Sequence, residues 1–135
     1  MDKLNIGIAG LGNVGSALIE TIEENKIYFL DKAGVEFNIV GISAKTKNKK
    51  RNFNISNYNW YDDPIEMSKN DDFNVIVELI GEERGISYEI IQTALKNNKH
   101  VVTGNKALIA NHGKELFKLA SFHSLALSYE AAVAG

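Results

Sequence analysis

Residues 4–15 read LNIGIAGLGNVG, an apolar run that passes directly into a glycine-rich turn. The run 4–10 is rich in isoleucine and ends in glycine, as is typical of a buried strand. From Asn13 onward, apolar residues recur at helical spacing. The turn itself has the pattern G-x-G-x-x-G between the predicted strand and the predicted helix. This stretch therefore predicts a strand–loop–helix unit that binds a dinucleotide.

Each glycine of the turn has a physical reason. Gly10 allows the tight turn, Gly12 lets the backbone approach a pyrophosphate, and Gly15 lets helix and strand pack closely. The free N–H groups and the dipole of the helix favour phosphate groups. A purely structural strand-to-helix turn without a ligand would have the same pattern, and it remains the alternative.

The rest of the chain alternates between apolar runs and helical periods. Further strands are predicted at 36–43, 73–80, 99–103 and 125–129. Helices are predicted from 13 towards Gly34, from Asp62 or Asp63 with Pro64 in the first turn, at 86–97, and at 107–122 with a possible break at 111–113. The polar stretch 44–61 is predicted to be an exposed loop. Apolar strands separated by helices indicate an α/β fold, a Rossmann-like doubly wound parallel sheet with helices on both faces.

The composition is that of an ordinary globular protein. The chain has 135 residues, 44% of them hydrophobic and 24% charged, a net charge of −2 and no cysteine. No apolar run approaches the ~20 residues of a membrane span, and a strand pattern begins too early for a signal peptide. We therefore expect a cytoplasmic protein without a nucleic-acid or membrane partner. The last residues, 130–135, complete no element, so we expect one NAD(P)-binding domain, 1–135, cut from a longer protein.

The end of the second predicted strand bears on the choice of cofactor. NAD sites often place an acidic residue there to bind the ribose 2′-hydroxyl, but this chain has Ala44 and Lys45, followed by a basic run to Arg51. Cationic side chains would attract a 2′-phosphate, which favours NADP over NAD. For most of these lysines a solvated surface loop is the simpler explanation. A nucleic-acid site is disfavoured because no aromatic residues interleave with the charges.

A second loop is expected to face the same crevice. In the usual strand order the first and fourth predicted strands, 4–10 and 99–103, lie side by side, so we expect the loop that contains Asn105 and Lys106 to face the glycine turn where the strand order reverses. Lys106 would then lie near the nicotinamide and hold a substrate carboxylate or stabilise an oxyanion. The alternative is a solvent-facing lysine in a first helical turn capped by Asn105, although a cation there opposes the helix dipole.

Four blocks of sequence resemble one family. GLGNVGSAL (10–18), VIVELIG (75–81), KHVVTGNKALIANHGKELF (99–117) and YEAAVAG (129–135) closely resemble the N-terminal nucleotide-binding domain of homoserine dehydrogenase. The resemblance covers the chain apart from about 44–70, and the third block is the most specific. Gly104 replaces a more usual alanine, and IGEERGIS (80–87) replaces a more usual IGG and a proline-containing turn.

The resemblance implies a reaction and a set of contacts. Such enzymes reversibly reduce aspartate 4-semialdehyde to homoserine with NADPH or NADH, in the pathway to threonine, isoleucine and methionine. It implies that Lys106 lies by the nicotinamide and substrate, and that Lys45 meets the 2′-phosphate. Together with the glycine turn, the expected cofactor contacts are Gly10, Leu11, Gly12, Asn13, Val14, Gly15, Lys45, Ile80, Thr103, Asn105 and Lys106.

The resemblance also implies features near and beyond the last residue. Glu130, Val133 and Gly135 would contribute to a site for a monovalent cation, sodium, mostly through carbonyl oxygens; a carboxylate that merely ends a strand remains the alternative for Glu130. The principal catalytic lysine and the substrate-binding carboxylates would belong to a second domain, which would also form a homo-oligomer. Two other functions stay open: another NAD(P)-linked oxidoreductase of semialdehydes or sugars, and a non-catalytic nucleotide-sensing module.

Overall fold

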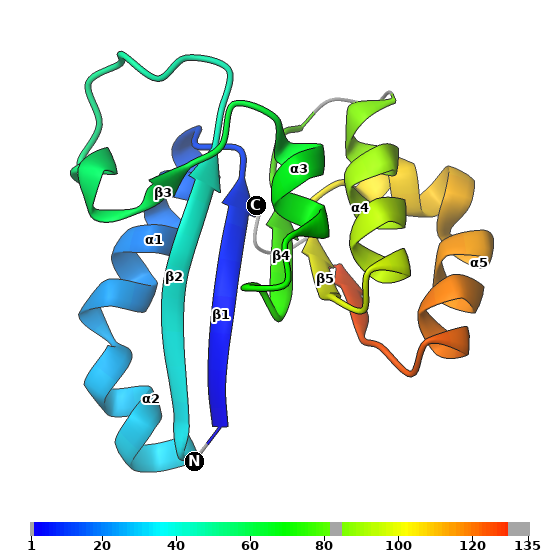
Figure 1. The fold of residues 1–135 in the computed structure, drawn as a ribbon, viewed down its shortest axis with the longest axis horizontal. Coiled ribbons are helices and arrows are strands. Elements are labelled where there is room, and N and C mark those ends of the chain that lie inside the picture. The colour runs from blue at the N-terminus through cyan, green and yellow to red at the C-terminus, as the bar shows by residue number, and fades with distance from the viewer. Residues whose placement is uncertain (1, 82–84, 130–135) are drawn as a thin grey trace.

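A single parallel sheet organises the molecule, which we describe from a computed structural model for residues 2–81 and 85–129. The strands are β1 (Asp2–Ala9), β2 (Val35–Ser43), β3 (Asn59–Trp60), β4 (Val75–Glu78), β5 (His100–Thr103) and β6 (Leu127–Tyr129). Their order is β3-β2-β1-β4-β5-β6, and every neighbouring pair is parallel (Figure 1). The strand order reverses between β1 and β4, so the predicted doubly wound fold is confirmed.

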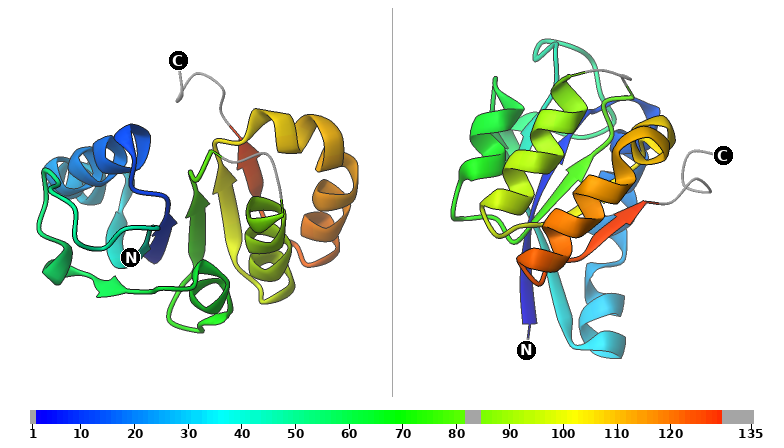
Figure 2. Two further views of the ribbon diagram at one scale, coloured as in Figure 1. Left: turned by 90° about the horizontal axis from the view of Figure 1, so that it is seen from above. Right: turned by 90° about the vertical axis from the view of Figure 1, so that its right-hand side faces the viewer.

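Helices cover the sheet from two sides. They are α1 (Asn13–Glu24), α2 (Lys26–Ala33), α3 (Pro64–Lys69), α4 (Ile86–Lys96) and α5 (Lys106–Phe122), with a short 3₁₀ helix at Ile55–Asn57. Figure 2 shows α1 and α2 on one face, and α3, α4 and α5 on the other. Asp63, one of the two predicted caps of α3, accepts a hydrogen bond from the N–H of Ile65 at 2.9 Å. No helix of the described residues is long and apolar enough to span a bilayer.

The two faces of the sheet carry separate apolar cores. One core joins β1 and β2 to α1 through residues such as Ile8, Ile19 and Ile42. The other joins the sheet to α3, α4 and α5 and includes Phe73 and Ile90. Burial on both faces explains why these strands read as nearly continuous apolar runs.

Phe73 fills a slot made by two glycines. A Cβ atom at Gly41 would lie 2.6 Å from the Phe73 ring, and one at Gly7 would lie 3.1 Å from it. The ring also meets Tyr61 edge to face, with centroids 5.8 Å apart. Burial, with a smaller contribution from the charge of Asp72, raises the pKa of Tyr61. The two glycines let a large aromatic side chain pack directly on the backbone of β1 and β2.

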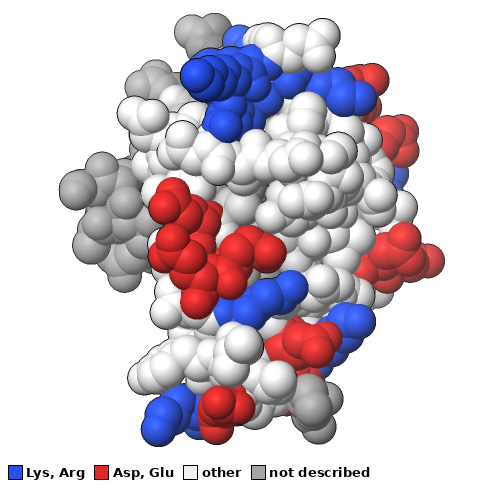
Figure 3. Space-filling model, turned by 90° about the vertical axis from the view of Figure 1, so that its left-hand side faces the viewer, with Lys and Arg blue, Asp and Glu red and all other residues white. Residues whose placement is uncertain are grey.

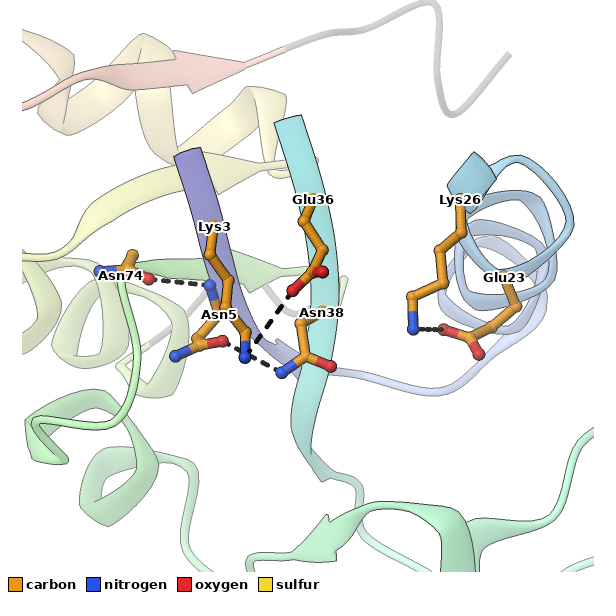
Figure 4. Close-up of polar contacts among 7 residues, drawn as sticks. All are labelled: Lys3, Asn5, Glu23, Lys26, Glu36, Asn38 and Asn74. Atoms are coloured by element: carbon orange, nitrogen blue, oxygen red, sulfur yellow. Dashed lines mark hydrogen bonds and ion pairs between the residues drawn. The ribbon is translucent and has the colours of Figure 1, made fainter. Parts of the chain in front are cut away.

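Polar side chains connect neighbouring strands in the amino-terminal half of the sheet. The side chain of Asn38 donates to the Oδ1 of Asn5 at 3.1 Å, and Asn74 accepts from the backbone N–H of Asn5 at 2.8 Å (Figure 4). Lys3 and Glu36 add an exposed ion pair at 3.7 Å between the same two strands. These contacts fix the alignment of β1 with β2 before the register shifts between Ile6 and Gly7.

Two helix predictions differ from the structure. The helix expected to run from 13 towards Gly34 is divided at Asn25, whose side chain donates to the carbonyl oxygen of Thr21 at 2.8 Å. Such a side-chain bond competes with the helical backbone. Gly34 does end α2 in a left-handed conformation, as predicted. The break expected at 111–113 is absent from α5, where Gly113 is buried close to Ile109.

The prediction that the strand before Lys106 lies beside β1 was wrong. The stretch 44–61 is not all loop, because Asn59–Trp60 forms β3 at the sheet edge. Counting this short strand makes Val75–Glu78 the fourth strand, and it is β4 that pairs with β1. The strand before Lys106 is β5, two strand spacings from β1, or about 10 Å.

Candidate functional site

A pocket of about 500 Å³ lies at the carboxyl ends of the strands. This volume is within the range of small-molecule sites, roughly 300–1,000 Å³. The loops that follow β1, β2, β3 and β4 supply most of its walls. The lining residues are Gly10, Leu11, Gly12, Ser43, Ala44, Lys45, Thr46, Lys49, Arg51, Asp62, Pro64, Leu79, Ile80 and Ile86. The pocket therefore spans the reversal of strand order between β1 and β4, the usual position of ligands in such sheets.

The three glycines of the turn have different surroundings. Gly10 has φ +106, and a Cβ there would lie 2.5 Å from the carbonyl carbon of Leu79. A Cβ at Gly15 would overlap the carbonyl oxygen of Gly10. In contrast, a Cβ at Gly12 would meet nothing within 4 Å. Gly10 and Gly15 are thus required by packing, whereas Gly12 keeps open a space on the pocket wall.

Helix α1 begins beside that space. Its N-cap is Gly12, and no side chain caps it by a hydrogen bond among the described residues. The first N–H groups of a helix have no partner within the helix. An anion at this position can be bound by these groups and by the helix dipole. The chemistry of the turn therefore fits a phosphate ligand.

The loop after β2 forms the basic wall of the pocket. Arg51 donates from Nη1 to the carbonyl oxygen of Lys47 at 2.9 Å and from Nη2 to that of Thr46. Its guanidinium carbon lies 5.8 Å from the centroid of the Trp60 ring. Arg51 thereby holds the loop in a closed shape, and Lys45 and Lys49 line the pocket beside it. The buried Nε of Arg51 has no hydrogen-bond partner in the part of the chain that the structure describes.

Charge is distributed unevenly over this side of the molecule. Figure 3 shows Lys and Arg side chains gathered at the upper end, where the loop after β2 lies in Figure 1, and Asp and Glu side chains mainly below them. The local excess of positive charge explains how a chain of net charge −2 can attract an anionic ligand at one end.

The pocket lining includes residues that were not predicted as cofactor contacts, and one of them is a carboxylate. Asp62, just after β3, lines the pocket and accepts a hydrogen bond from Nε1 of Trp60 at 2.8 Å. Its position after a strand was the available signal, but the strand is only two residues long. At the end of β2 itself the structure has Ser43, Ala44 and Lys45, without the carboxylate that many NAD sites have.

The predicted cofactor contacts fall into two groups. Five of them line the pocket: Gly10, Leu11, Gly12, Lys45 and Ile80. Asn13, Val14 and Gly15 form the first turn of α1 behind it. Thr103, Asn105 and Lys106 do not line it and lie at the end of β5 and the start of α5, where Thr103 and Asn105 are buried and Lys106 is exposed.

The predicted cation site lies outside the described residues, because Glu130, Val133 and Gly135 are all in the segment after Tyr129. Within residues 2–81 and 85–129, no group of three or more His, Asp or Glu side chains is arranged to hold a metal ion.

Comparison with known proteins identifies the family. The sequence model described as "Homoserine dehydrogenase, NAD binding domain" matches residues 10–130. The chain belongs to the homoserine dehydrogenase family. It is 36% identical to the homoserine dehydrogenases of Neisseria gonorrhoeae and Pseudomonas aeruginosa, over its whole length in both cases. It spans only 31% and 30% of these relatives, so it corresponds to about a third of a homoserine dehydrogenase chain.

Solved structures of homoserine dehydrogenases have the same fold. The Staphylococcus aureus enzyme at pH 7.5 aligns with a TM-score of 0.89 and 42% identity, over 98% of this chain and 33% of that one. A hyperthermophilic archaeal homoserine dehydrogenase, determined in complex with NADPH, aligns with a TM-score of 0.75 and 29% identity, over 96% of this chain and 44% of that one. These matches agree with the family expected from the four sequence blocks.

Proposed function

We propose that this chain binds NADP(H) in the pocket at the carboxyl edge of the sheet and is the cofactor-binding part of an enzyme that interconverts L-homoserine and L-aspartate 4-semialdehyde. Membership of the homoserine dehydrogenase family supports the reaction. The observation that carries the cofactor is the pairing of an open space at Gly12 with a basic wall at the end of β2. The NADPH bound to the archaeal relative agrees with it.

Each wall of the pocket suits one part of the cofactor. The pyrophosphate would be held at Gly12 and the first turn of α1, by backbone N–H groups. The 2′-phosphate would be held by Lys45, with Lys49 and Arg51 on the same wall.

When bound, the cofactor supplies or accepts the hydride of the reaction. In this proposal Lys106 acts from the start of α5, where its ammonium group holds a substrate carboxylate or stabilises the oxyanion. The exposure of Lys106 leaves it accessible to a ligand.

Reversing the charge at Lys45 tests the 2′-phosphate contact. We expect Lys45→Glu to weaken NADPH binding by roughly 10- to 100-fold, since a hydrogen bond between charged groups contributes about 1.5–3 kcal/mol. NADH, which lacks the 2′-phosphate, should change by less than about threefold, as expected for screened surface charges. Calorimetric titration of the 135-residue chain with both cofactors measures the difference.

Lys118→Glu is the matched control for this experiment. Lys118 is an exposed lysine of α5 away from the pocket, and its replacement causes the same change in net charge. It should leave both affinities unchanged. An equal loss for NADPH and NADH in Lys45→Glu would contradict the proposed contact.

A second expectation concerns turnover. The resemblance places the principal catalytic lysine and the substrate carboxylates in another domain, so the 135-residue chain should bind NADPH yet oxidise no homoserine. Absorbance at 340 nm after mixing chain, NADP⁺ and homoserine measures this, with the full-length Pseudomonas aeruginosa homoserine dehydrogenase as positive control. Measurable oxidation by the chain alone would refute the assignment of those groups to another domain. The sodium site and the homo-oligomer are likewise implied by the resemblance, and both stay predictions.

A further inference from the structure

A buried carboxylate lies at the end of β4, next to the strand that carries the glycine turn. Glu78 is 0% exposed. Burying a carboxylate is costly unless it is hydrogen-bonded. The sequence showed it only as a lone acidic residue in an otherwise apolar strand, and no role was assigned to it.

Glu78 joins three separate elements. Its Oε2 accepts hydrogen bonds from the backbone N–H of Ile80 and from Oγ of Ser87, both at 2.9 Å. Its Oε1 accepts from Oγ1 of Thr103 at 2.7 Å. The carboxylate thus connects the loop after β4 with the first turn of α4 and the end of β5.

The contact with Thr103 continues to the start of α5. The single hydroxyl proton of Thr103 goes to Glu78, so its oxygen is left to accept from the N–H of Asn105 at 3.0 Å. Oδ1 of Asn105 in turn accepts from the N–H of Leu108 at 3.0 Å. Glu78 therefore orients the Thr103 hydroxyl, whose oxygen lone pairs then face the N–H of Asn105. Asn105 caps α5, and Lys106 is the first residue of that helix.

These groups account for most of the buried polar side chains of the described residues. Seven polar or charged residues are buried there, and four of them are Glu78, Ser87, Thr103 and Asn105. All four lie at the carboxyl edge of the sheet rather than in the middle of a core. Polar groups concentrated at this edge indicate a role in setting loop geometry beside the pocket.

We propose that Glu78 is a positioning residue, which fixes the first turn of α5 so that Lys106 is held at the nicotinamide end of the cofactor. The inference rests on the proposed function, because it requires NADP(H) in the pocket. Glu78 contacts neither substrate nor cofactor in this proposal. It acts through Thr103 and Asn105.

Glu78→Gln is the test variant, since it keeps the shape and removes one acceptor. If its amide oxygen stays on Ile80 and Ser87, its NH₂ group faces Thr103 and reverses that hydrogen bond. The hydroxyl proton of Thr103 must then find another acceptor, and the added NH₂ group competes with the N–H of Asn105 for the lone pairs of Thr103 Oγ1. We expect NADPH to bind about tenfold more weakly to the 135-residue chain, the equivalent of one lost hydrogen bond of about 1.4 kcal/mol.

Two comparisons separate positioning from a general structural effect. Adenosine 2′,5′-bisphosphate carries the adenosine and 2′-phosphate but no nicotinamide, so its affinity should be unchanged by Glu78→Gln. In a Lys106→Met background the effect of Glu78→Gln on NADPH should fall below about twofold, because the group through which it acts is gone. A merely structural role would weaken both ligands and would add to Lys106→Met.

The outcomes are distinct. An unchanged NADPH affinity in Glu78→Gln, or an equal loss in the Lys106→Met background, overturns the inference. If Glu78→Gln does not fold, Thr103→Val carries the same comparisons, and Thr103→Ser should lose less because it keeps the hydroxyl. A wild-type chain that binds neither ligand contradicts the proposed function itself, and the inference with it.

Discussion

Gly12→Ala is expected to abolish most cofactor binding while leaving the fold intact. A Cβ at this position meets nothing within 4 Å, so the free energy of unfolding should change by no more than about 0.5 kcal/mol. The same methyl group would occupy the space through which a pyrophosphate approaches the backbone. Overpacking of this kind costs about 1–3 kcal/mol, which corresponds to roughly 5- to 150-fold weaker NADPH binding.

Two other glycines give matched comparisons for that result. Gly15→Ala should lose stability, because its Cβ overlaps the carbonyl oxygen of Gly10. Gly113→Ala, in the middle of α5 and away from the pocket, should keep the NADPH affinity of the wild type. Chemical unfolding and calorimetric titration of the three variants separate stability from binding. Unchanged NADPH affinity in Gly12→Ala would show that this space is not the pyrophosphate site.

Phe73→Ala is expected to have the largest effect on stability. The side chain is 2% exposed and packs against two glycines and Tyr61, so truncation leaves a cavity that backbone atoms cannot fill. Such replacements cost about 3–5 kcal/mol, a large part of the 5–15 kcal/mol of a typical domain. Urea unfolding followed by circular dichroism gives the difference.

Phe122 provides the same chemical change at the surface. Its side chain is 84% exposed at the end of α5, so Phe122→Ala should change the free energy of unfolding by less than about 0.5 kcal/mol. If the two variants were equally stable, the slot formed by Gly7 and Gly41 would not be the tightly packed site described here.

Local sequence patterns predicted most of this fold, because strands that are buried on both faces have long apolar runs that are easy to recognise. The run that became β1 and the glycine turn at 10–15 could be placed from residues alone. Strand β3 could not, because its two residues pair with β2 only in the folded sheet. That omission moved Lys106 one strand too close to the glycine turn. The division of α1 and α2 was also missed, since it depends on the side-chain bond of Asn25.

The residues at the candidate site show a similar division. Gly10, Gly12 and Lys45, which line the pocket, could be singled out because their neighbours along the chain indicated a ligand contact. Glu78 was passed over, because its three hydrogen-bond donors come from different elements and are brought together only by folding. A single carboxylate in an apolar strand was the one sign of it in the sequence.

The hydrogen bonds of Arg51 have a consequence for how cofactor preference can change during evolution. Its acceptors, the carbonyl groups of Thr46, Lys47 and Lys49, all lie within the same loop, so the shape of the basic wall depends on residues 45–51 and on the contact of Arg51 with Trp60. Such a segment can be exchanged as a unit without altering the hydrogen bonds of the sheet. Under the proposed function, exchanging this one short segment would alter the preference between NADP and NAD, while the glycine turn and Lys106 stay unchanged.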